Sequence, residues 1–176
     1  MTMTVVMTTT QVAVDRLRTE DGPALDAMFA RCSLDSVYSR FFTGLPRLPR
    51  RYVESAFSGP PAQHDALVLR YGDGLHIAGL ASFVADSRSE VPAGELGILI
   101  QDGWQRRGYG AQLVARLLER AADRGVEELV VSVLPWRTGL LDSLARRLEM
   151  VSLVNDDDYL TAHYRIGLGG SLGDDA

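Results

Sequence analysis

The segment that most constrains the fold lies just past the middle of the chain, where an apolar run, a glycine-rich turn and an amphipathic stretch follow one another. Glu95 to Ile100 is typical of a buried strand, and Gln101 to Arg107 of a polar turn. Gly108 to Arg124 then has the periodicity of a helix, with Leu113, Val114, Leu117, Leu118 and Ala121 on one face. A strand that passes through glycines into a helix exposes free backbone N–H groups at the positive end of the helix dipole. This order predicts an anion-binding turn suited to a diphosphate.

The same turn excludes two common nucleotide-binding folds. Arg106 and Arg107 add positive charge, and either can pair with a phosphate. A dinucleotide-binding G-x-G-x-x-G motif fails because Leu113 stands at the third glycine position. A P-loop needs a lysine, and all 18 basic residues of this chain are arginines.

The remaining periodicity predicts a mixed α/β domain. The predicted strands are Gln11 to Leu17, Asp65 to Tyr71, Leu75 to Val84, Glu95 to Ile100, Leu129 to Val133, Val151 to Val154 and Tyr159 to Ile166, and the predicted helices are Ala24 to Ala30, Ser36 to Phe42, Arg50 to Phe57, Gly108 to Arg124 and Gly139 to Arg147. Thr19 to Asp21 with Pro23 favour a helix start, and Gly125 favours a helix end. The two strands joined by the long helix are expected to be parallel. An antiparallel meander thus precedes the crossover, and a final strand pair follows it.

The domain boundaries follow from composition. No internal repeat and no linker divides the middle of the chain, so residues 11–166 are predicted to form a single domain. The threonine-rich start, residues 1–10, and the glycine-rich acidic tail, residues 167–176, are expected to be disordered.

Composition excludes several partners and ligands. A net charge of -5 and a pI near 5.2 argue against nucleic acid. The apolar runs are shorter than the roughly 20 residues that cross a bilayer, and no signal peptide is recognisable, which favours the cytoplasm. The lone Cys32 cannot form an internal disulfide. We expect no metal site, because the three histidines are scattered and Asp156 to Asp158 lack the spacing of a calcium loop.

The pattern Gln105-x-x-Gly108-x-Gly110-Ala111 after a strand resembles motif A of the GCN5-related N-acetyltransferase (GNAT) superfamily. The resemblance extends from about Val12 to Ile166. It includes Leu17 to Asp21 and Tyr38 to Phe42, and the latter segment looks like bacterial members that act on protein lysines. The resemblance implies a GNAT-like twisted mixed sheet of about six to seven strands flanked by helices. It also implies a splayed parallel strand pair that opens a V-shaped cleft.

Acetyl-CoA is the cosubstrate that this resemblance implies. The pantetheine arm would bond to the backbone of the strand near Ile98 to Ile100, and the diphosphate would lie over the glycine turn. The residues implied to bind the cofactor are Ile98, Leu99, Ile100, Gln105, Arg106, Arg107, Gly108, Tyr109, Gly110, Ala111 and Arg137. Arg137 or Thr138 stands where the family often has an asparagine. Tyr109 is expected to serve mainly in packing.

Glu95 is the candidate base, because it matches the place of the glutamate in the histone-acetylating branch of the family, with its side chain facing the acceptor. A solvated glutamate at the start of a strand is the alternative. The tyrosine that often serves as general acid is replaced by Ala145, and Glu149-Met150 replaces a Gly-Phe pair. Two functions therefore remain open: acetyl transfer to a primary amine by direct attack, and a non-catalytic acyl-CoA-binding module or sensor.

The acceptor is expected to contact the first helices and the last hairpin, Leu34 to Phe57 and Val154 to Tyr164. These segments contain a basic group and an acidic group, namely Arg40, Arg47, Arg50 and Arg51, and Asp156, Asp157 and Asp158. The resemblance of Tyr38 to Phe42 favours a protein lysine or N-terminus over a small drug-like amine. Trp136 either walls the acceptor pocket or packs in the core. The expected partners are acetyl-CoA, the amine acceptor, and a second copy of the chain in a homodimer.

Overall fold

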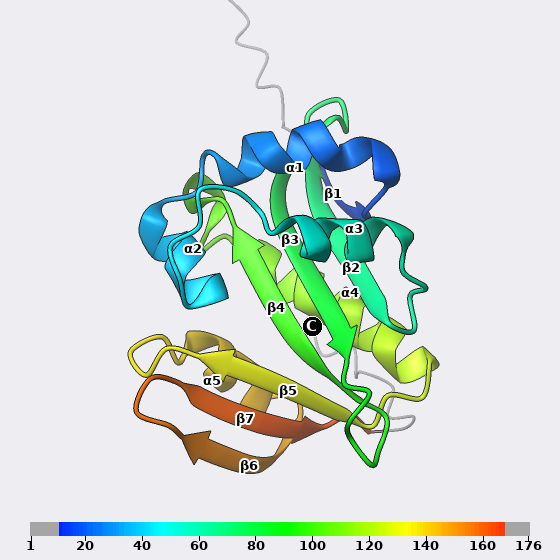
Figure 1. The fold of residues 1–176 in the computed structure, drawn as a ribbon, viewed down its shortest axis with the longest axis vertical. Helices are drawn as coiled ribbons and strands as arrows, with labels where there is room; N and C mark the ends of the chain where they lie inside the picture. Colours follow the sequence, from blue (N-terminus) through cyan, green and yellow to red (C-terminus); the bar gives the residue numbers. More distant parts are fainter. Residues whose placement is uncertain (1–10, 168–176) are drawn as a thin grey trace, which may run out of the picture.

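A seven-stranded sheet organises the computed structural model of this protein, which describes residues 11–167 (Figure 1). The strands are β1 (Val12–Arg16), β2 (His64–Tyr71), β3 (His76–Ala85), β4 (Ala93–Ile100), β5 (Glu128–Val133), β6 (Glu149–Asn155) and β7 (Leu160–Arg165). Their order in the sheet is β1-β2-β3-β4-β5-β7-β6. Neighbours run antiparallel except β4 and β5, which are parallel. The predicted mixed α/β fold, with its meander, crossover and final strand pair, is confirmed.

Helices cover both faces of the sheet. The first three, α1 (Gly22–Phe29), α2 (Leu34–Phe41) and α3 (Arg50–Ser58), lie on one face, while α4 (Tyr109–Asp123) crosses the other (Figure 1). α5 (Gly139–Ala145) packs against β5 and β7 and shares the core of α4. Two short 3-10 turns, η1 (Thr19–Asp21) and η2 (Asp102–Trp104), precede α1 and α4.

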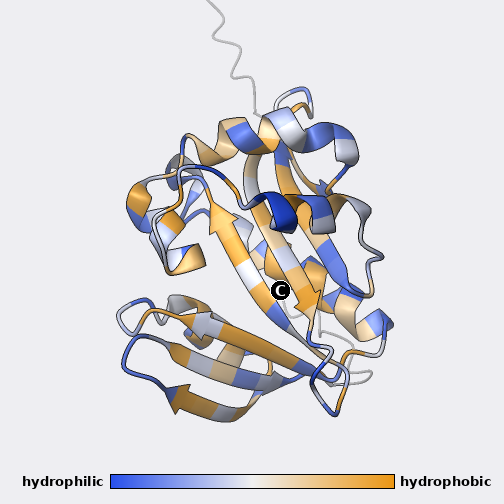
Figure 2. Ribbon diagram, viewed as in Figure 1, coloured by the Kyte–Doolittle hydropathy of each residue, from blue (hydrophilic) through white to orange (hydrophobic). Residues whose placement is uncertain are grey.

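Each face of the sheet has its own hydrophobic core. Leu69, Leu96, Leu113 and Leu117 belong to the core under α4, and Leu25, Val68, Ile77 and Leu99 belong to the core under α1. Because both faces are covered, β2 and β3 are buried along most of their length instead of alternating between core and solvent. Figure 2 shows the resulting concentration of apolar residues on the central strands.

The parallel strands β4 and β5 separate soon after they meet. They pair at three positions, Ala93 with Glu128, Gly94 with Leu129 and Glu95 with Val130. β4 then continues to Ile100 along β3, while β5 runs on to Val133 beside β7. One edge of β4 after Glu95 is therefore free of strand pairing. The splayed parallel pair implied by the sequence is confirmed.

Element boundaries differ from the sequence predictions in a few places. α4 begins at Tyr109, because Gly108 has a φ of +83° and cannot belong to a right-handed helix. β4 begins already at Ala93. α5 ends at Ala145. Gly125, with a φ of +75°, follows the end of α4 as predicted.

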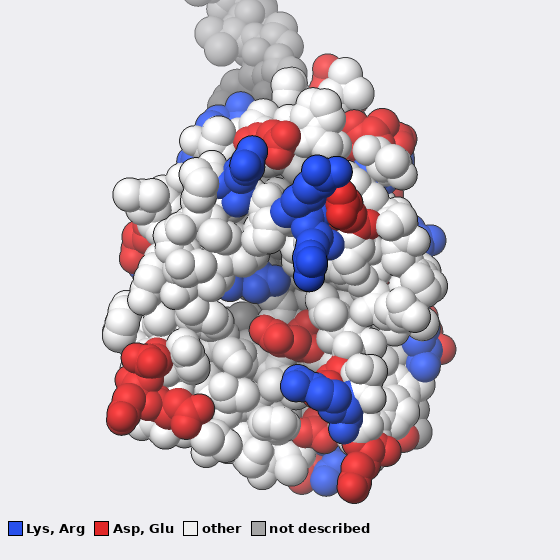
Figure 3. Space-filling model, in the orientation of Figure 1, with Lys and Arg blue, Asp and Glu red and all other residues white. Residues whose placement is uncertain are grey.

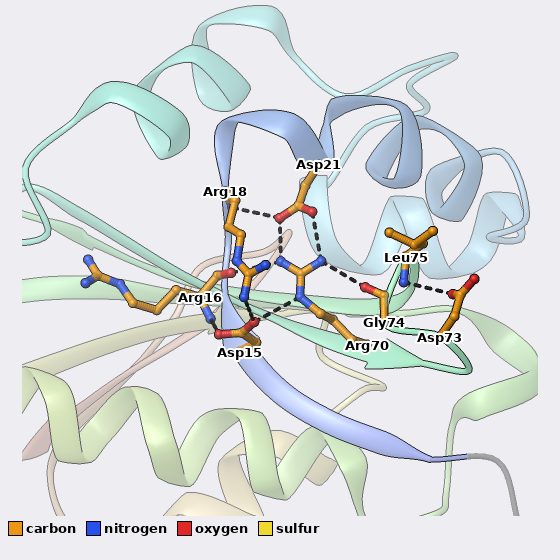
Figure 4. Close-up of polar contacts among 8 residues, drawn as sticks. All are labelled: Asp15, Arg16, Arg18, Asp21, Arg70, Asp73, Gly74 and Leu75. Atoms are coloured by element: carbon orange, nitrogen blue, oxygen red, sulfur yellow. Dashed lines mark hydrogen bonds and ion pairs between the residues drawn. The ribbon is translucent and has the colours of Figure 1, made fainter.

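Asp21 lies at the predicted helix start, and its carboxylate is buried against Arg70 of β2 (Figure 4). Arg70 Nη1 and Nη2 donate to the two carboxylate oxygens of Asp21 at 2.8 and 2.7 Å, and Arg70 Nε donates to Asp15 at 3.2 Å. The backbone N–H of Arg18 also donates to Asp21, at 2.7 Å. Burial opposes ionisation of Asp21, but the hydrogen bonds from Arg70 and Arg18 outweigh it and lower the pKa of the carboxyl. This pair ties the β1–α1 connection to β2.

Residues 1–10 and 168–176, predicted to be disordered, lie outside the described residues, and the single-domain division stays a prediction. Between residues 11 and 167, no helix combines the length and apolarity that crossing a membrane requires. The same residues contain no group of three His, Cys, Asp or Glu side chains arranged to hold a metal ion. β6, at the edge of the sheet, exposes Val151, Leu153 and Val154. The expected homodimer stays a prediction.

Candidate functional site

The separation of β4 from β5 opens a cleft with a volume of about 680 Å³. β4, α2, the start of α4 and the β5–α5 connection contribute its walls. Among the residues predicted to form the site, the cleft brings together Glu95, Ile98, Leu99, Ile100, Gln105, Arg106, Gly110 and Arg137. Figure 3 shows the hollow on this face, between the α2–α3 side and the β5–β7 side, with both basic and acidic atoms exposed in it.

β4 presents different side chains to its two sides. Leu96, Ile98 and Ile100 pack toward the core under α4, whereas Leu99 packs toward the core under α1. Because successive residues of a strand alternate, Glu95 and Gly97 share the side of Leu99. Glu95 therefore faces the α1–α3 side of the sheet, while α4, which begins at the glycine turn, covers the opposite side. β4 therefore lies between the two sides from which ligands can enter the cleft.

The glycine turn has the geometry that an anion requires. Gly108 has a φ of +83°, and a Cβ added there would meet nothing within 4 Å. A Cβ added to Gly110 would lie 3.4 Å from Ile98 Cδ1, at van der Waals contact. Within the described chain, no side chain caps the start of α4, so its first backbone N–H groups are open to a ligand. These groups, the positive end of the helix and Arg106 in the cleft fit a diphosphate.

Other predicted cofactor residues lie beside the cleft. The exposed Arg107 has its guanidinium 5.9 Å from the centre of the Trp104 ring. Tyr109 packs against the same ring, with centroids 5.7 Å apart, in keeping with a packing role. Ala111 lines a smaller apolar pocket of about 260 Å³ between α4 and α5. Their contacts with a cofactor stay predictions, as does a contact with Gly108.

A polar network that we did not predict from the sequence ties the turn to α2. Asp102 accepts hydrogen bonds from the N–H and Oγ of Ser33, at 2.8 and 2.6 Å, and from Ser36 Oγ at 3.0 Å. Burial opposes the ionisation of Asp102, but these bonds outweigh it and lower its pKa. Gln105 Nε2 donates to Ser36 Oγ and to the Ile100 carbonyl, both at 2.9 Å. Ser33 caps α2, and a serine before a helix was the one signal of this network in the sequence.

The β5–α5 connection closes another side of the cleft. Arg137 forms an ion pair with Asp35 of α2, so this connection and α2 meet beside the cleft. Trp136 lines the cleft and is 70% exposed. The alternative that Trp136 packs in the core is therefore wrong. The cofactor contact predicted for Arg137 stays a prediction, and its observed partner is a carboxylate.

The two segments expected to select the acceptor meet at one end of the cleft. Phe42, which ends α2 with a φ of +56° and lines the cleft, packs on Tyr159 with ring centroids 5.0 Å apart. Tyr159 belongs to the turn between β6 and β7, next to the exposed Asp156 to Asp158. The acidic turn thus lies at the side of the cleft, as a solvated loop.

Cys32 is outside this chemistry. Burial raises the pKa of its thiol to about 11, and the nearby Asp102 carboxylate acts in the same direction. The thiol donates to the Met28 carbonyl at 3.5 Å and does not line the cleft. A thiol that stays protonated is a poor nucleophile.

The mixed sheet, its splayed parallel pair and the glycine turn before α4 are the features that the sequence resemblance implied. The model of the Acetyltransferase (GNAT) family matches residues 33–146, which include the turn, β4 and β5. The chain therefore belongs to the GNAT acetyltransferase family. It is an acyltransferase, and acetyl-CoA is its cosubstrate, as the motif implied.

Solved structures agree with this assignment. The GNAT domain of S. lividans PAT is similar with a TM-score of 0.76 and 20% identity, over 86% of this chain and 89% of that chain. The yncA protein of Salmonella typhimurium, solved with its cofactor acetyl-CoA, has a TM-score of 0.69 and 13% identity, over 94% and 99% of the two chains. A GCN5-related N-acetyltransferase from Kribbella flavida reaches 0.67 at 16% identity, over 88% and 97%. At these identities the likeness concerns the fold. A comparison with curated protein sequences found no match.

Proposed function

We propose that this acyltransferase moves the acetyl group of acetyl-CoA to a primary amine by direct attack. The observation that carries the proposal is the cleft between β4 and β5, which Glu95 and the glycine turn enter from different ends of β4. A donor and an acceptor can therefore meet along one strand without sharing an entrance.

The cofactor is held, in this proposal, by the free edge of β4 and by the glycine turn. Residues 96–100 of β4 have no strand partner on the β5 side, so their backbone groups on that side can bond to an extended arm. The backbone N–H groups that begin α4 bind the diphosphate, and Arg106 adds a charged hydrogen bond. When bound, acetyl-CoA supplies the activated acetyl group.

Glu95 is proposed to take the proton of the attacking amine. Its side chain is exposed, lines the cleft and faces the α1–α3 side, so an amine that enters from that side reaches it directly or through one water. A backbone N–H on the free edge of β4 is suited to stabilise the developing oxyanion. Direct attack is supported by the position and high pKa of Cys32, the single cysteine of the sequence.

The acceptor proposed is the amine of a protein lysine or N-terminus. This choice is supported by the resemblance of Tyr38 to Phe42 to lysine-acetylating relatives and by the exposed arginines of the segment that follows. Arg50 and Arg51 begin α3 and are exposed, and Figure 3 shows basic atoms over this helix. An exposed basic surface attracts acidic partners and is sensitive to salt.

Thiol release from acetyl-CoA in the presence of amines, lysine peptides and intact proteins tests the proposal. We expect turnover above the rate of hydrolysis with at least one amine, and a product heavier by one acetyl group. Tight binding of CoA without turnover on any amine would overturn the proposal.

Replacing Gly108 by glutamate is expected to weaken CoA binding about 100-fold, because like charges brought together cost several kcal/mol. A Cβ at this position would meet no atom within 4 Å, and the substitution would bring a carboxylate to the turn proposed for the diphosphate. Calorimetry with CoA measures the effect. Gly108→Ala isolates the strain of a φ of +83°, and Gly44→Glu adds the same charge at another open glycine. Equal affinities for wild type and Gly108→Glu would contradict the turn as the diphosphate site.

A further inference from the structure

Arg40 of α2 lies on the acceptor side of β4, in the same cleft as Glu95. Its guanidinium rests on Gly97, so closely that a Cβ on Gly97 would collide with it. The rings of Phe41 and Tyr52 flank the guanidinium carbon at 4.9 and 5.8 Å from their centres. A glycine in the middle of a strand thus makes room for a cation on its surface.

The charge of Arg40 has no partner among residues 11–167, where it forms neither an ion pair nor a hydrogen bond and contacts aromatic faces instead. Other arginines that are largely buried are paired: Arg70 with Asp15 and Asp21, and Arg124 with Asp65. The neighbouring His64 cannot supply a negative charge, and burial and the Arg40 cation both lower the pKa of its imidazole. A half-buried guanidinium that lines the cleft and has no bonded partner among these residues is free to pair with an anion of a ligand.

The diphosphate of the cofactor is not suited to be that anion. The glycine turn follows the end of β4 and opens α4, whose core lies on the side of Ile98 and Ile100. Arg40 instead covers Gly97, in the middle of β4, on the side of Glu95. Residues two apart on one face of a strand are separated by about 7 Å. Arg40 and the proposed base Glu95 therefore face the same part of the cleft, which is the part proposed for the acceptor.

We propose that Arg40 binds a carboxylate of the acceptor that lies close in space to the primary amine. This inference rests on the proposed amine acetylation. A guanidinium offers a planar pair of N–H donors that matches a carboxylate, and the stacked rings hold that plane. With a protein lysine as the acceptor, the carboxylate belongs to an acidic side chain beside it. A free amino acid is a second source of the same chemistry, and the test separates the two.

Two matched acceptor pairs test the inference and separate these sources. One pair is 4-aminobutyrate and its amide, and the other is a peptide whose single lysine is flanked by glutamates and the same peptide with glutamines. We expect wild type to prefer the carboxylate member of at least one pair by about 10- to 100-fold in kcat/KM, mainly through KM. Arg40→Gln should remove this preference, and Arg40→Lys should keep part of it. Arg116→Gln, an exposed arginine of α4 on the opposite face of the sheet, serves as the matched control.

The outcomes are distinguishable. Equal kcat/KM for both members of both pairs in wild type would overturn the inference and leave the acetylation of amines intact. An equal loss of kcat on both members in Arg40→Gln would show that Arg40 positions Glu95, which also overturns it. No turnover on any amine would remove the proposed function and the inference together. If Arg40→Gln does not fold, the preference of wild type for the carboxylate acceptor and its partial loss in Arg40→Lys still test the inference.

Discussion

Replacing Glu95 by glutamine is expected to lower kcat by about 10²- to 10⁴-fold, the usual contribution of a general base. Glutamine keeps the size and hydrogen-bonding reach of the side chain but cannot take a proton. Glu95 is exposed and lies at the last position where β4 and β5 pair, so the substitution should leave the cleft and the glycine turn intact. Thiol release at saturating amine measures kcat, and calorimetry with CoA should give an unchanged Kd.

The pH dependence of this variant separates a base from a structural glutamate. An amine that has already lost its proton needs no base, so the activity of Glu95→Gln should recover as the pH rises toward the pKa of the amine. Glu90→Gln, an exposed glutamate in the β3–β4 loop, should behave as wild type. A kcat within about twofold of wild type near pH 7 for Glu95→Gln would instead support a merely solvated glutamate.

The parts of the fold that the sequence could predict depend on local patterns. Residues 95–111 combine an apolar strand, two glycines and the start of a long amphipathic helix, and each of these signals depends on near neighbours. The parallel pairing of β4 with β5 followed from the helix between them. The start of α4 differs from the prediction because the positive φ of Gly108 excludes this residue from the helix.

The contacts within the site could not be predicted in this way, because they join residues far apart in the chain. Ser33 and Asp102 are 69 positions apart, and neither has a pattern that points to the other. The contact of Arg40 with Gly97 depends on the angle at which α2 crosses the sheet, and the hydrophobic periodicity of the sequence does not specify this angle. The exposure of Trp136 likewise depends on the path of the β5–α5 connection.

One helix, α2, connects all parts of the cleft. Ser36 in its first half bonds to Gln105 of the turn, Arg40 covers β4, and Phe42 at its end packs on Tyr159 of the last hairpin. The sides proposed for the cofactor and for the acceptor therefore share one helix. A change in the position of α2 would alter both sides together.

Replacing Arg70 by methionine is expected to lower the free energy of unfolding by about 3–5 kcal/mol, the cost of breaking a buried ion pair on one side. Methionine keeps the length and apolar stem of the side chain, but Asp21 would remain buried without its cation. Urea unfolding near pH 7 measures the loss. Arg88→Met, which breaks an exposed pair with Asp86, should change stability by less than about 0.5 kcal/mol.

Lowering the pH should reduce the difference in unfolding free energy between wild type and Arg70→Met. In wild type the folded pKa of Asp21 lies below its ordinary value of 3.8, so the carboxylate stabilises the fold above that pH, and this contribution is lost as the pH falls through the folded pKa. In Arg70→Met the effect of burial on the pKa of Asp21 is opposed only by the N–H and the charge of Arg18, so Asp21 should take up a proton at higher pH and relieve the penalty. The gap in unfolding free energy should therefore be smaller at pH 4 than at pH 7. A gap that stays constant would mean that the loss comes from packing of the Arg70 stem and not from the buried charge.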